Sequence, residues 1–196
     1  IVLPKNNEDE FIEFASKLCI KKLYFLYDFD EHIKKNQKIS NLKENKNINI
    51  EIGFIVNQKN LNQASKFSKF IVVKSPDNGR YFIESKKIKL IYGLEEANKK
   101  DYLHQRASGL NHILCDMAKK NNVSIGFSYS SLFNKNQTLS SILIGRMMQN
   151  IQLCKKYKCN VVIASFAENP FDLRPYHDIK SLFSLLGLIG RDSKFI

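Results

Sequence analysis

The chain has 196 residues, and its 43% hydrophobic and 26% charged content is typical of one globular domain, which we expect over residues 1–196. No apolar run approaches the roughly 18 residues that a membrane-spanning helix needs, so we expect no membrane partner. Lys and Arg outnumber Asp and Glu by 31 to 19, and the net charge of +12 favours a polyanionic partner, with nucleic acid as the first candidate. A nucleotide bias of the genome toward Lys codons is the alternative explanation.

Four cysteines are spread along the chain without a CxxC pair or the spacing of metal ligands. Their neighbours are apolar positions of expected helices. The pattern predicts reduced cysteines in the core and a cytoplasmic location. The residues are Cys19, Cys115, Cys154 and Cys159.

The first half of the chain alternates strand-like and helix-like segments. Residues 1–3 predict the end of a strand, and residues 8–18 predict a helix whose acidic first turn suits the helix dipole. The polar stretch 28–47 is expected to form a solvated surface, and SPDNGR at 75–80 is a strong turn signal. Buried strands are expected at 22–27, 48–56, 70–74 and 88–92, and short helices at 60–68 and 81–85.

The second half contains the clearest helix and strand pair, within residues 104–130. Ser108 is the expected N-cap of a helix whose apolar residues recur from Leu110 to Ala118 on one face. A short buried strand follows at 123–127. The remaining expected elements are an amphipathic helix at 140–158 with Arg146, Asn150 and Lys156 mostly outside, a strand at 161–166, and a helix at 178–186 that Gly187 ends.

This alternation predicts an α/β fold with a parallel sheet. An open doubly wound sheet usually has a glycine-rich first turn, whereas residues 4–10 contain no glycine. We therefore expect a compact TIM-type (β/α) barrel with about seven clear strands, short loops and a degraded or missing eighth unit.

Catalytic motifs are scarce. The sequence has no GxSxG, P-loop or GxGxxG motif. Its four histidines lie neither at expected strand ends nor in an HxH pair, so we expect no dinuclear metal site: they are His32, His104, His112 and His177. His112 and Cys115 could share a ligand face, but an exposed histidine beside a half-buried cysteine is the simpler interpretation. Asp28 and Asp30 could act as acid or base, but a helix-capping role is more usual.

Basic residues offer the stronger functional signal, although each has a structural alternative. Arg106 before the expected helix start could bind phosphate or pair with Asp101. Arg174 could contact phosphate or pair with Asp172 or Asp178. The lysines at the ends of two expected helices could complement helix dipoles or form a phosphate-binding surface: Lys119, Lys120, Lys155, Lys156 and Lys158. Tyr129 and Phe133 could stack on bases or pack against the protein.

Three blocks of the sequence resemble one known family. They are SGLNHILCDMAKKNNVSIGFSYSSL at 108–132, RMMQNIQLCKKYKCNVVIASFAENPFDLR at 146–174, and DIKSLFSLLGL at 178–188. In order and spacing they are similar to the RNase P protein component 3 family, the TIM-barrel subunit of archaeal and eukaryotic RNase P.

This resemblance implies a relative of the PHP phosphoesterase barrel that binds no cofactor of its own. It implies a ribonuclease P subunit, not catalytic by itself, that with a Pop5-type partner supports the catalytic RNA in removing the 5′ leader from precursor tRNA. The RNA would require Mg²⁺. The residues carried over from the resemblance for RNA contact are Arg106, His112, Lys120 and Arg174. The full set that we expect to bind RNA adds Lys119, Arg146 and Lys156.

Two positions depart from the family pattern. The family usually has a small residue, often glycine, after the serine that ends the seventh strand, whereas Phe166 follows Ser165 here. Pro175 and Tyr176 replace the usual Ser-Pro after Arg174. The alternative function is that of a diverged PHP-type, metal-dependent phosphoesterase.

Overall fold

The computed structural model describes residues 1–30, 48–74, 78–98, 100–133, 136–188 and 193–194. Helices and strands alternate along the chain. The strands are β1 (Lys22–Asp28), β2 (Asn49–Ile55), β3 (Ile71–Lys74), β4 (Leu90–Tyr92), β5 (Ser124–Ser128), β6 (Val161–Ala164) and β7 (Ser193–Lys194). The helices are α1 (Glu8–Lys17), α3 (Leu61–Phe67), α4 (Gly79–Ser85), α5 (His112–Lys120), α6 (Gln137–Tyr157) and α7 (Tyr176–Leu185), with 3₁₀ turns η2 (Leu94–Glu96), η3 (Ser130–Leu132) and η4 (Pro170–Asp172).

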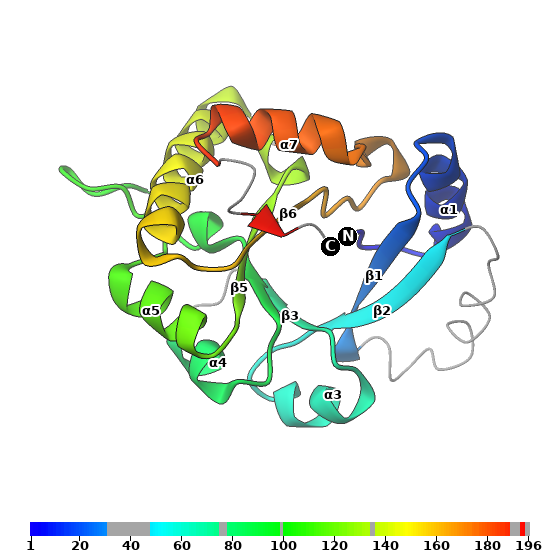
Figure 1. The fold of residues 1–196 in the computed structure, drawn as a ribbon, viewed down its shortest axis with the longest axis horizontal. Coiled ribbons are helices and arrows are strands. Elements are labelled where there is room, and N and C mark those ends of the chain that lie inside the picture. Colours follow the sequence, from blue (N-terminus) through cyan, green and yellow to red (C-terminus); the bar gives the residue numbers. More distant parts are fainter. Residues whose placement is uncertain (31–47, 75–77, 99, 134–135, 189–192, 195–196) are drawn as a thin grey trace.

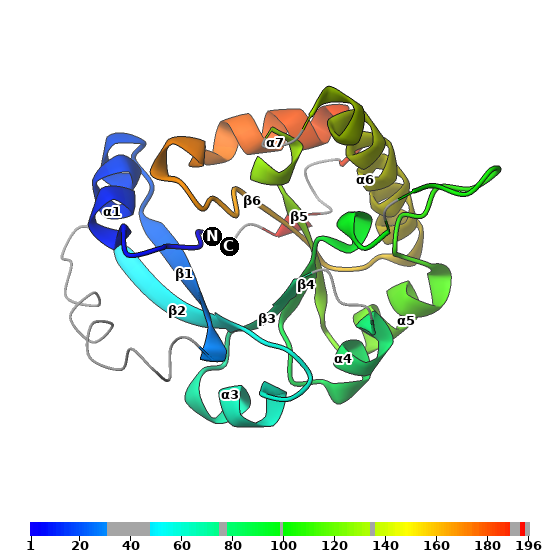
Figure 2. The same ribbon diagram turned by 180° about the vertical axis from the view of Figure 1, so that it is seen from behind.

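The seven strands form one parallel sheet in chain order, and the sheet curls. Val2 bridges the two sides of the curl, because it pairs in parallel with Phe25 of β1 and with Ala167 beyond β6. The Val2 N–H donates to Tyr24 O at 2.9 Å, and the Leu3 N–H donates to Ala167 O at 2.8 Å. Helices surround the sheet in both views (Figures 1 and 2). The predicted α/β barrel class is confirmed.

The strand prediction was right in type and incomplete at the two ends of the chain. The first expected strand, at residues 1–3, is reduced to the single bridge at Val2. The short β7 beside β6 was not predicted, since two residues leave no periodic pattern. Most of the polar stretch 28–47 and the start of the SPDNGR turn lie outside the described residues.

Helix α5 begins later than expected. The prediction of Ser108 as the N-cap is wrong: Asn111 caps the helix, and its Oδ1 accepts a hydrogen bond from the Leu114 N–H at 2.9 Å. Ser108 is instead buried, and its carbonyl accepts from Asn150 Nδ2 at 2.8 Å. Ser and Asn are comparable cap formers, so the competing tertiary contact decides which residue caps the helix.

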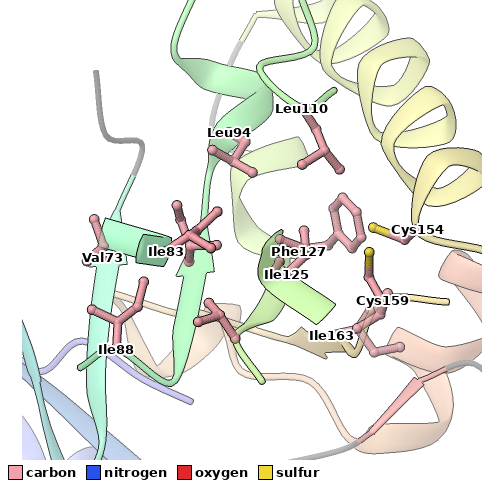
Figure 3. Packing of buried hydrophobic residues seen from close by; sticks show 14 of the residues in the cluster. Val73, Ile83, Ile88, Leu94, Leu110, Ile125, Phe127, Cys154, Cys159 and Ile163 are labelled. Carbon is pink, nitrogen blue, oxygen red and sulfur yellow. The ribbon is translucent and has the colours of Figure 1, made fainter. Parts of the chain in front are cut away.

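In β1 to β6 the side chains alternate between a core inside the curl of the sheet and two cores on its outer face. Tyr24, Leu26, Val72 and Leu90 point inside the curl of the sheet and pack with the residues of β6. Their neighbours Val73, Ile91, Ile125 and Phe127 belong to the larger core between sheet and helices. Figure 3 shows part of this outer core, where Phe127 packs near Cys154 and Cys159. Because both faces are covered, the strands read as continuous apolar runs.

Three of the four cysteines confirm the prediction of buried positions. Cys115, Cys154 and Cys159 are buried, and Cys159 Sγ lies 3.4 Å from the Cys115 carbonyl. The prediction is wrong for Cys19, which is exposed with a φ of 55° just after α1 ends. Within the described ranges all four thiols are free, and none of the helices is long and apolar enough to cross a membrane.

Candidate nucleic-acid interface

The basic residues proposed from the sequence divide between the two ends of the barrel. In a parallel sheet all strands begin at one end and finish at the other. Lys119 and Lys120 end α5 just before β5, and Lys156 lies just before β6, so these lysines are at the end where strands begin. Arg106 and Arg174 follow β4 and β6 and lie at the end where strands finish. The predicted set therefore does not form one site.

Eight exposed lysines gather at the end where strands begin. They lie where α4, α5 and α6 lead into β4, β5 and β6, which are neighbours in the sheet. The helices are adjacent in Figure 1, and two hydrogen bonds join their ends: Asn121 Nδ2 donates to Ile83 O at 2.8 Å, and Asn160 Nδ2 donates to Asn122 Oδ1 at 3.0 Å. We call this surface the lysine rim: Lys86, Lys87, Lys89, Lys119, Lys120, Lys155, Lys156 and Lys158.

The charge of the lysine rim is not neutralised by neighbouring carboxylates. Within the part of the chain that the structure describes, no rim lysine lies within ion-pair distance of an acid. Lys87 Nζ donates to Asn62 Oδ1 at 2.6 Å, and Lys155 Nζ donates to Gly187 O at 3.2 Å. Helix C-termini carry partial negative charge, which offsets a full positive charge on each lysine only in part. The rim therefore presents several uncompensated cations to solvent.

The contacts of Arg106 differ from both roles proposed from the sequence, which were phosphate binding at a helix start and an ion pair with Asp101. Its Nη1 donates to the carbonyl of Gly145 in α6 at 3.1 Å, and a Cβ at Gly145 would lie 3.1 Å from the Arg106 guanidinium carbon. Glycine at 145 therefore makes room for the arginine. The side chain is exposed, but the helix start lies at Asn111, so no helix N-terminus joins it in a phosphate site. Asp101 instead pairs with Arg146, at 2.7 Å.

Arg146 corrects the sequence prediction most clearly. The sequence predicted this residue on the exposed face of its helix, as part of the RNA-binding set. The side chain is only 2% exposed. Its Nε donates to Asp101 Oδ1 at 2.7 Å, and its Nη1 donates to the carbonyls of Glu95 at 2.8 Å and Asn98 at 2.7 Å. Asp101 also accepts from the Ala107 N–H at 2.8 Å. Arg146 thus acts as a clamp that holds the first side of the loop between η2 and α5 directly and the second side through Asp101, which also binds Ala107. This loop projects from the barrel in Figures 1 and 2. The buried guanidinium has almost no surface to offer RNA.

The electrostatics at the clamp agree with this role. Desolvation by itself would raise the pKa of Asp101. The hydrogen bond from the Ala107 N–H and the hydrogen bond and charge of Arg146 outweigh it, and the pKa lies below its ordinary value. Asn150, one turn along α6, is also fully buried. The sequence pattern predicted both residues on the exposed face, because such a prediction assumes that only one face of the helix is buried. Helix α6 instead packs against α5, η2 and η3, which bury more than one face.

His112 and Asp28 agree with the simpler interpretations, whereas Arg174 makes contacts that neither of its interpretations named. His112 is exposed, with its ring centroid 6.4 Å from that of Tyr157, and Cys115 is fully buried instead of half-buried. Asp28 closes a turn by accepting from the Asp30 N–H at 2.9 Å. Arg174 donates from Nη1 to the carbonyls of Phe171 at 2.6 Å and Leu173 at 2.9 Å.

A small cavity of about 170 Å³ lies at the end of the barrel where strands finish, where TIM-barrel enzymes have their active sites. Two of its charged lining residues, Lys74 and Glu168, pair with one another. Glu168 contacts Lys5 Nζ at 2.7 Å and Lys74 Nζ at 3.9 Å, and the hydrogen bond from Lys5 holds the Glu168 pKa below its ordinary value. Burial raises the pKa of Tyr92, which keeps this phenol neutral. Across the described residues, no group of three or more His, Cys, Asp or Glu is placed to hold a metal ion.

Comparison with known proteins gives consistent results. The family model described as RNase P subunit p30 matches residues 100–195. Ribonuclease P protein component 3 of Methanococcus vannielii is 29% identical over 167 residues, which cover 81% of this chain and 69% of that protein. The Thermococcus kodakarensis protein of the same name is 38% identical over 80 residues, but these cover only 41% of this chain and 36% of that protein.

The fold is also similar to that of a chain in the cryo-EM structure of archaeal ribonuclease P with mature tRNA. The TM-score is 0.76 at 18% sequence identity, and the match covers 95% of this chain and 82% of the other. At this identity the similarity concerns the fold alone. The family-model match over residues 100–195 and the relatives named ribonuclease P protein component 3 make this part of the chain a member of that family.

Proposed function

We propose that the chain is a protein subunit of ribonuclease P that binds RNA through the lysine rim and supports the catalytic RNA in removing the 5′ leader from precursor tRNA. The lysine rim carries this proposal. Its eight exposed lysines come from three adjacent helix ends and have no described carboxylate partner. Such a surface neutralises backbone phosphates and releases their counterions, which is the main sequence-independent source of affinity for RNA.

The proposed partners are RNase P RNA, precursor tRNA and a Pop5-type protein subunit. The first two agree with a fold neighbour that is part of archaeal ribonuclease P bound to tRNA. The Pop5-type partner rests on family resemblance. In this proposal the protein is not catalytic by itself, the RNA binds the Mg²⁺ that cleavage requires, and the complex acts in the cytoplasm.

The alternative of a metal-dependent phosphoesterase has less support. Such an enzyme needs several carboxylate or histidine ligands that converge at the barrel end where strands finish. The carboxylate of Glu168 is engaged there by Lys5 and Lys74, and the described residues do not supply a ligand group. The side chains present at this end therefore do not fit a dinuclear metal centre.

The test compares two triple variants with the same net charge. Lys119, Lys120 and Lys156 are changed to Ala in one, and the exposed Lys59, Lys66 and Lys100, which lie outside the rim, are changed to Ala in the other. RNA affinity is measured against salt concentration. We expect the rim variant to lose about one unit of the log–log salt slope per lysine, whereas the control variant keeps the slope of the unmodified chain.

The same two variants are then added to RNase P RNA and a Pop5-type subunit in a precursor-tRNA cleavage assay. The unmodified chain should raise the rate or lower the Mg²⁺ requirement, and the rim variant should lose most of this gain. Equal behaviour of the two variants in both assays would refute the role of the rim. Cleavage by the chain alone in EDTA would refute the non-catalytic role.

A further inference from the structure

An aromatic group with an open face lies at the end of the barrel opposite the lysine rim. Tyr129 and Phe133 flank η3, just after β5, and their ring centroids are 4.7 Å apart with an interplanar angle of 30°. Tyr129 packs against the main core, whereas Phe133 is 59% exposed. The guanidinium carbon of Arg174 lies 6.0 Å from the Tyr129 ring centroid. The three side chains form one continuous group, which we call the aromatic platform.

The backbone that carries the two rings is held on several sides. The Tyr129 N–H donates to Ala164 O at 2.9 Å, which ties the start of the turn to β6. Ser140 Oγ of α6 donates to Leu132 O at 2.7 Å, next to Phe133. The Phe133 N–H closes the turn by donating to Ser130 O at 3.2 Å. Phe133 is thus exposed on a well-anchored segment, so a ligand that stacks on it would not have to order the backbone.

Arg174 is equally well positioned. Its guanidinium donates to the carbonyls of Phe171 and Leu173, and its backbone N–H donates to Ser165 Oγ at 3.2 Å. These contacts engage Nη1 and leave the remaining N–H groups of the guanidinium to other acceptors. The positive charge therefore stays beside the Tyr129 ring, as in a cation–π pair.

The arrangement favours one kind of ligand. An exposed ring face next to a fixed guanidinium suits a molecule that has a flat π-system with an anion a short distance away. An unpaired nucleotide meets both conditions, because its base can stack on the ring and its phosphate can contact the arginine. A base within a duplex does not meet them, since both of its faces are already covered by its neighbours.

We propose that the aromatic platform of Tyr129, Phe133 and Arg174 binds one unpaired base of an RNA strand, with the base stacked on Phe133 and the adjacent phosphate near Arg174. This inference rests on the proposed function, because it assumes that the chain binds RNA. It adds a second contact of different chemistry at the other end of the barrel. The lysine rim recognises phosphates of any RNA, whereas the platform requires a single strand.

The test uses the full chain and two RNA probes, a single-stranded octamer that contains one 2-aminopurine and the same octamer annealed to its complement. Phe133 is changed to Ala, to Leu and to Trp. The matched control is Phe67→Ala, because Phe67 is 69% exposed on α3, away from the platform. Affinity and 2-aminopurine fluorescence are measured at low and at physiological salt.

We expect Phe133→Ala and Phe133→Leu to weaken binding of the single strand by about tenfold, as found for loss of one stacked base. Both changes should abolish the quenching of 2-aminopurine that stacking produces. Phe133→Trp should retain binding and quenching, and Phe67→Ala should change neither. Duplex binding should be the same in all variants.

Three results would overturn the inference: unchanged affinity of Phe133→Ala for the single strand, an equal loss for single strand and duplex, or the same loss in Phe67→Ala. If these occur while the rim variant still loses its salt slope, the platform alone is refuted and the proposed function stands. If neither probe binds the unmodified chain at low salt, both fail.

Discussion

Both ends of the barrel contain basic residues, but the surroundings of these residues differ between the two ends. Where strands finish, the cations are engaged within the protein: Arg146 binds Asp101, Lys5 binds Glu168, and Arg174 binds two carbonyls. Where strands begin, the lysine rim has no described acid partner. The net charge therefore overestimates the positive charge that is available to RNA at the end where strands finish. At the end where strands begin, it is a good measure of that charge.

This difference between the two ends arises from the lengths of the connections between strands and helices. The chain from β4 to α5 is long, and the buried Arg146 donates to two of its carbonyls and to the carboxylate of Asp101. The connections from α5 to β5 and from α6 to β6 are only a few residues long. The lysines at these helix ends complement the helix dipoles. A charged residue that the local backbone engages keeps fewer hydrogen-bond donors for a partner.

The largest effect is expected at the Arg146 clamp. Arg146→Met removes the partner of Asp101 and leaves the carbonyls of Glu95 and Asn98 without their donor, so the free energy of unfolding should fall by about 3 kcal/mol. Urea denaturation measures the loss. Arg80→Met is the control, because its exposed pair with Glu84 should contribute less than about 1 kcal/mol. Equal losses would show that Arg146 is not a clamp.

The cap of α5 should give the next largest effect. Asn111→Ala leaves the Leu114 N–H without its acceptor and should lower the free energy of unfolding by about 1 kcal/mol. Asn111→Asp keeps an acceptor and should retain most of the stability. Chemical denaturation of the two variants decides the matter, and an Asn111→Asp variant as unstable as Asn111→Ala would exclude the cap.

Salt should stabilise the chain through the lysine rim. Its like charges repel in the folded state, and added salt screens this repulsion. Between about 0.05 and 0.5 M NaCl the melting temperature should therefore rise, and the rise should be smaller in the Lys119/Lys120/Lys156→Ala variant than in the control triple variant. Thermal unfolding monitored by circular dichroism provides the comparison. A larger rise in the rim variant would mean that the rim charges do not repel.

The smallest effect concerns pH. The hydrogen bond from Lys5 lowers the pKa of Glu168 below its unfolded value of 4.5, so its stabilisation is present above pH 4.5 and is lost as the pH falls through the folded pKa. The side chains of Lys5 and Glu168 are 71% and 47% exposed, so the pair should contribute only about a few tenths of a kcal/mol. In the Lys5→Met variant, the free energy of unfolding measured at acidic pH should therefore decrease slightly less as the pH falls. A steeper decrease would contradict the pairing.

Sequence periodicity located most elements because the physical signal is local. The run at 22–27 became β1 at Lys22–Asp28, and the run at 123–127 became β5 at Ser124–Ser128. Side chains at such positions are buried on both faces of a covered parallel sheet, so the apolar run alone identifies them. Boundaries were less accurate. Helix α6 begins at Gln137, capped by Asn136, three residues before the expected start.

The candidate site was predictable only in part. Lys119, Lys120 and Lys156 were found because lysines at helix ends are exposed wherever the helix packs. Arg146 was misplaced, and the wider rim with Lys86, Lys87 and Lys89 was not recognised as one surface. Nothing local in the sequence says that the α4, α5 and α6 ends are neighbours, since their contacts join residues far apart in the chain.

The sequence by itself determined the alternation of strands and helices, the basic character and the family resemblance, because each depends on composition or on short-range spacing. Only the tertiary structure decided which cations remain available. Arg146 is buried because it contacts a loop whose Asp101 lies 45 residues earlier in the chain. The lysine rim exists because the ends of three helices are neighbours in space. Such long-range contacts set the surroundings of a charge, and these surroundings decide whether it stabilises the fold or binds a partner.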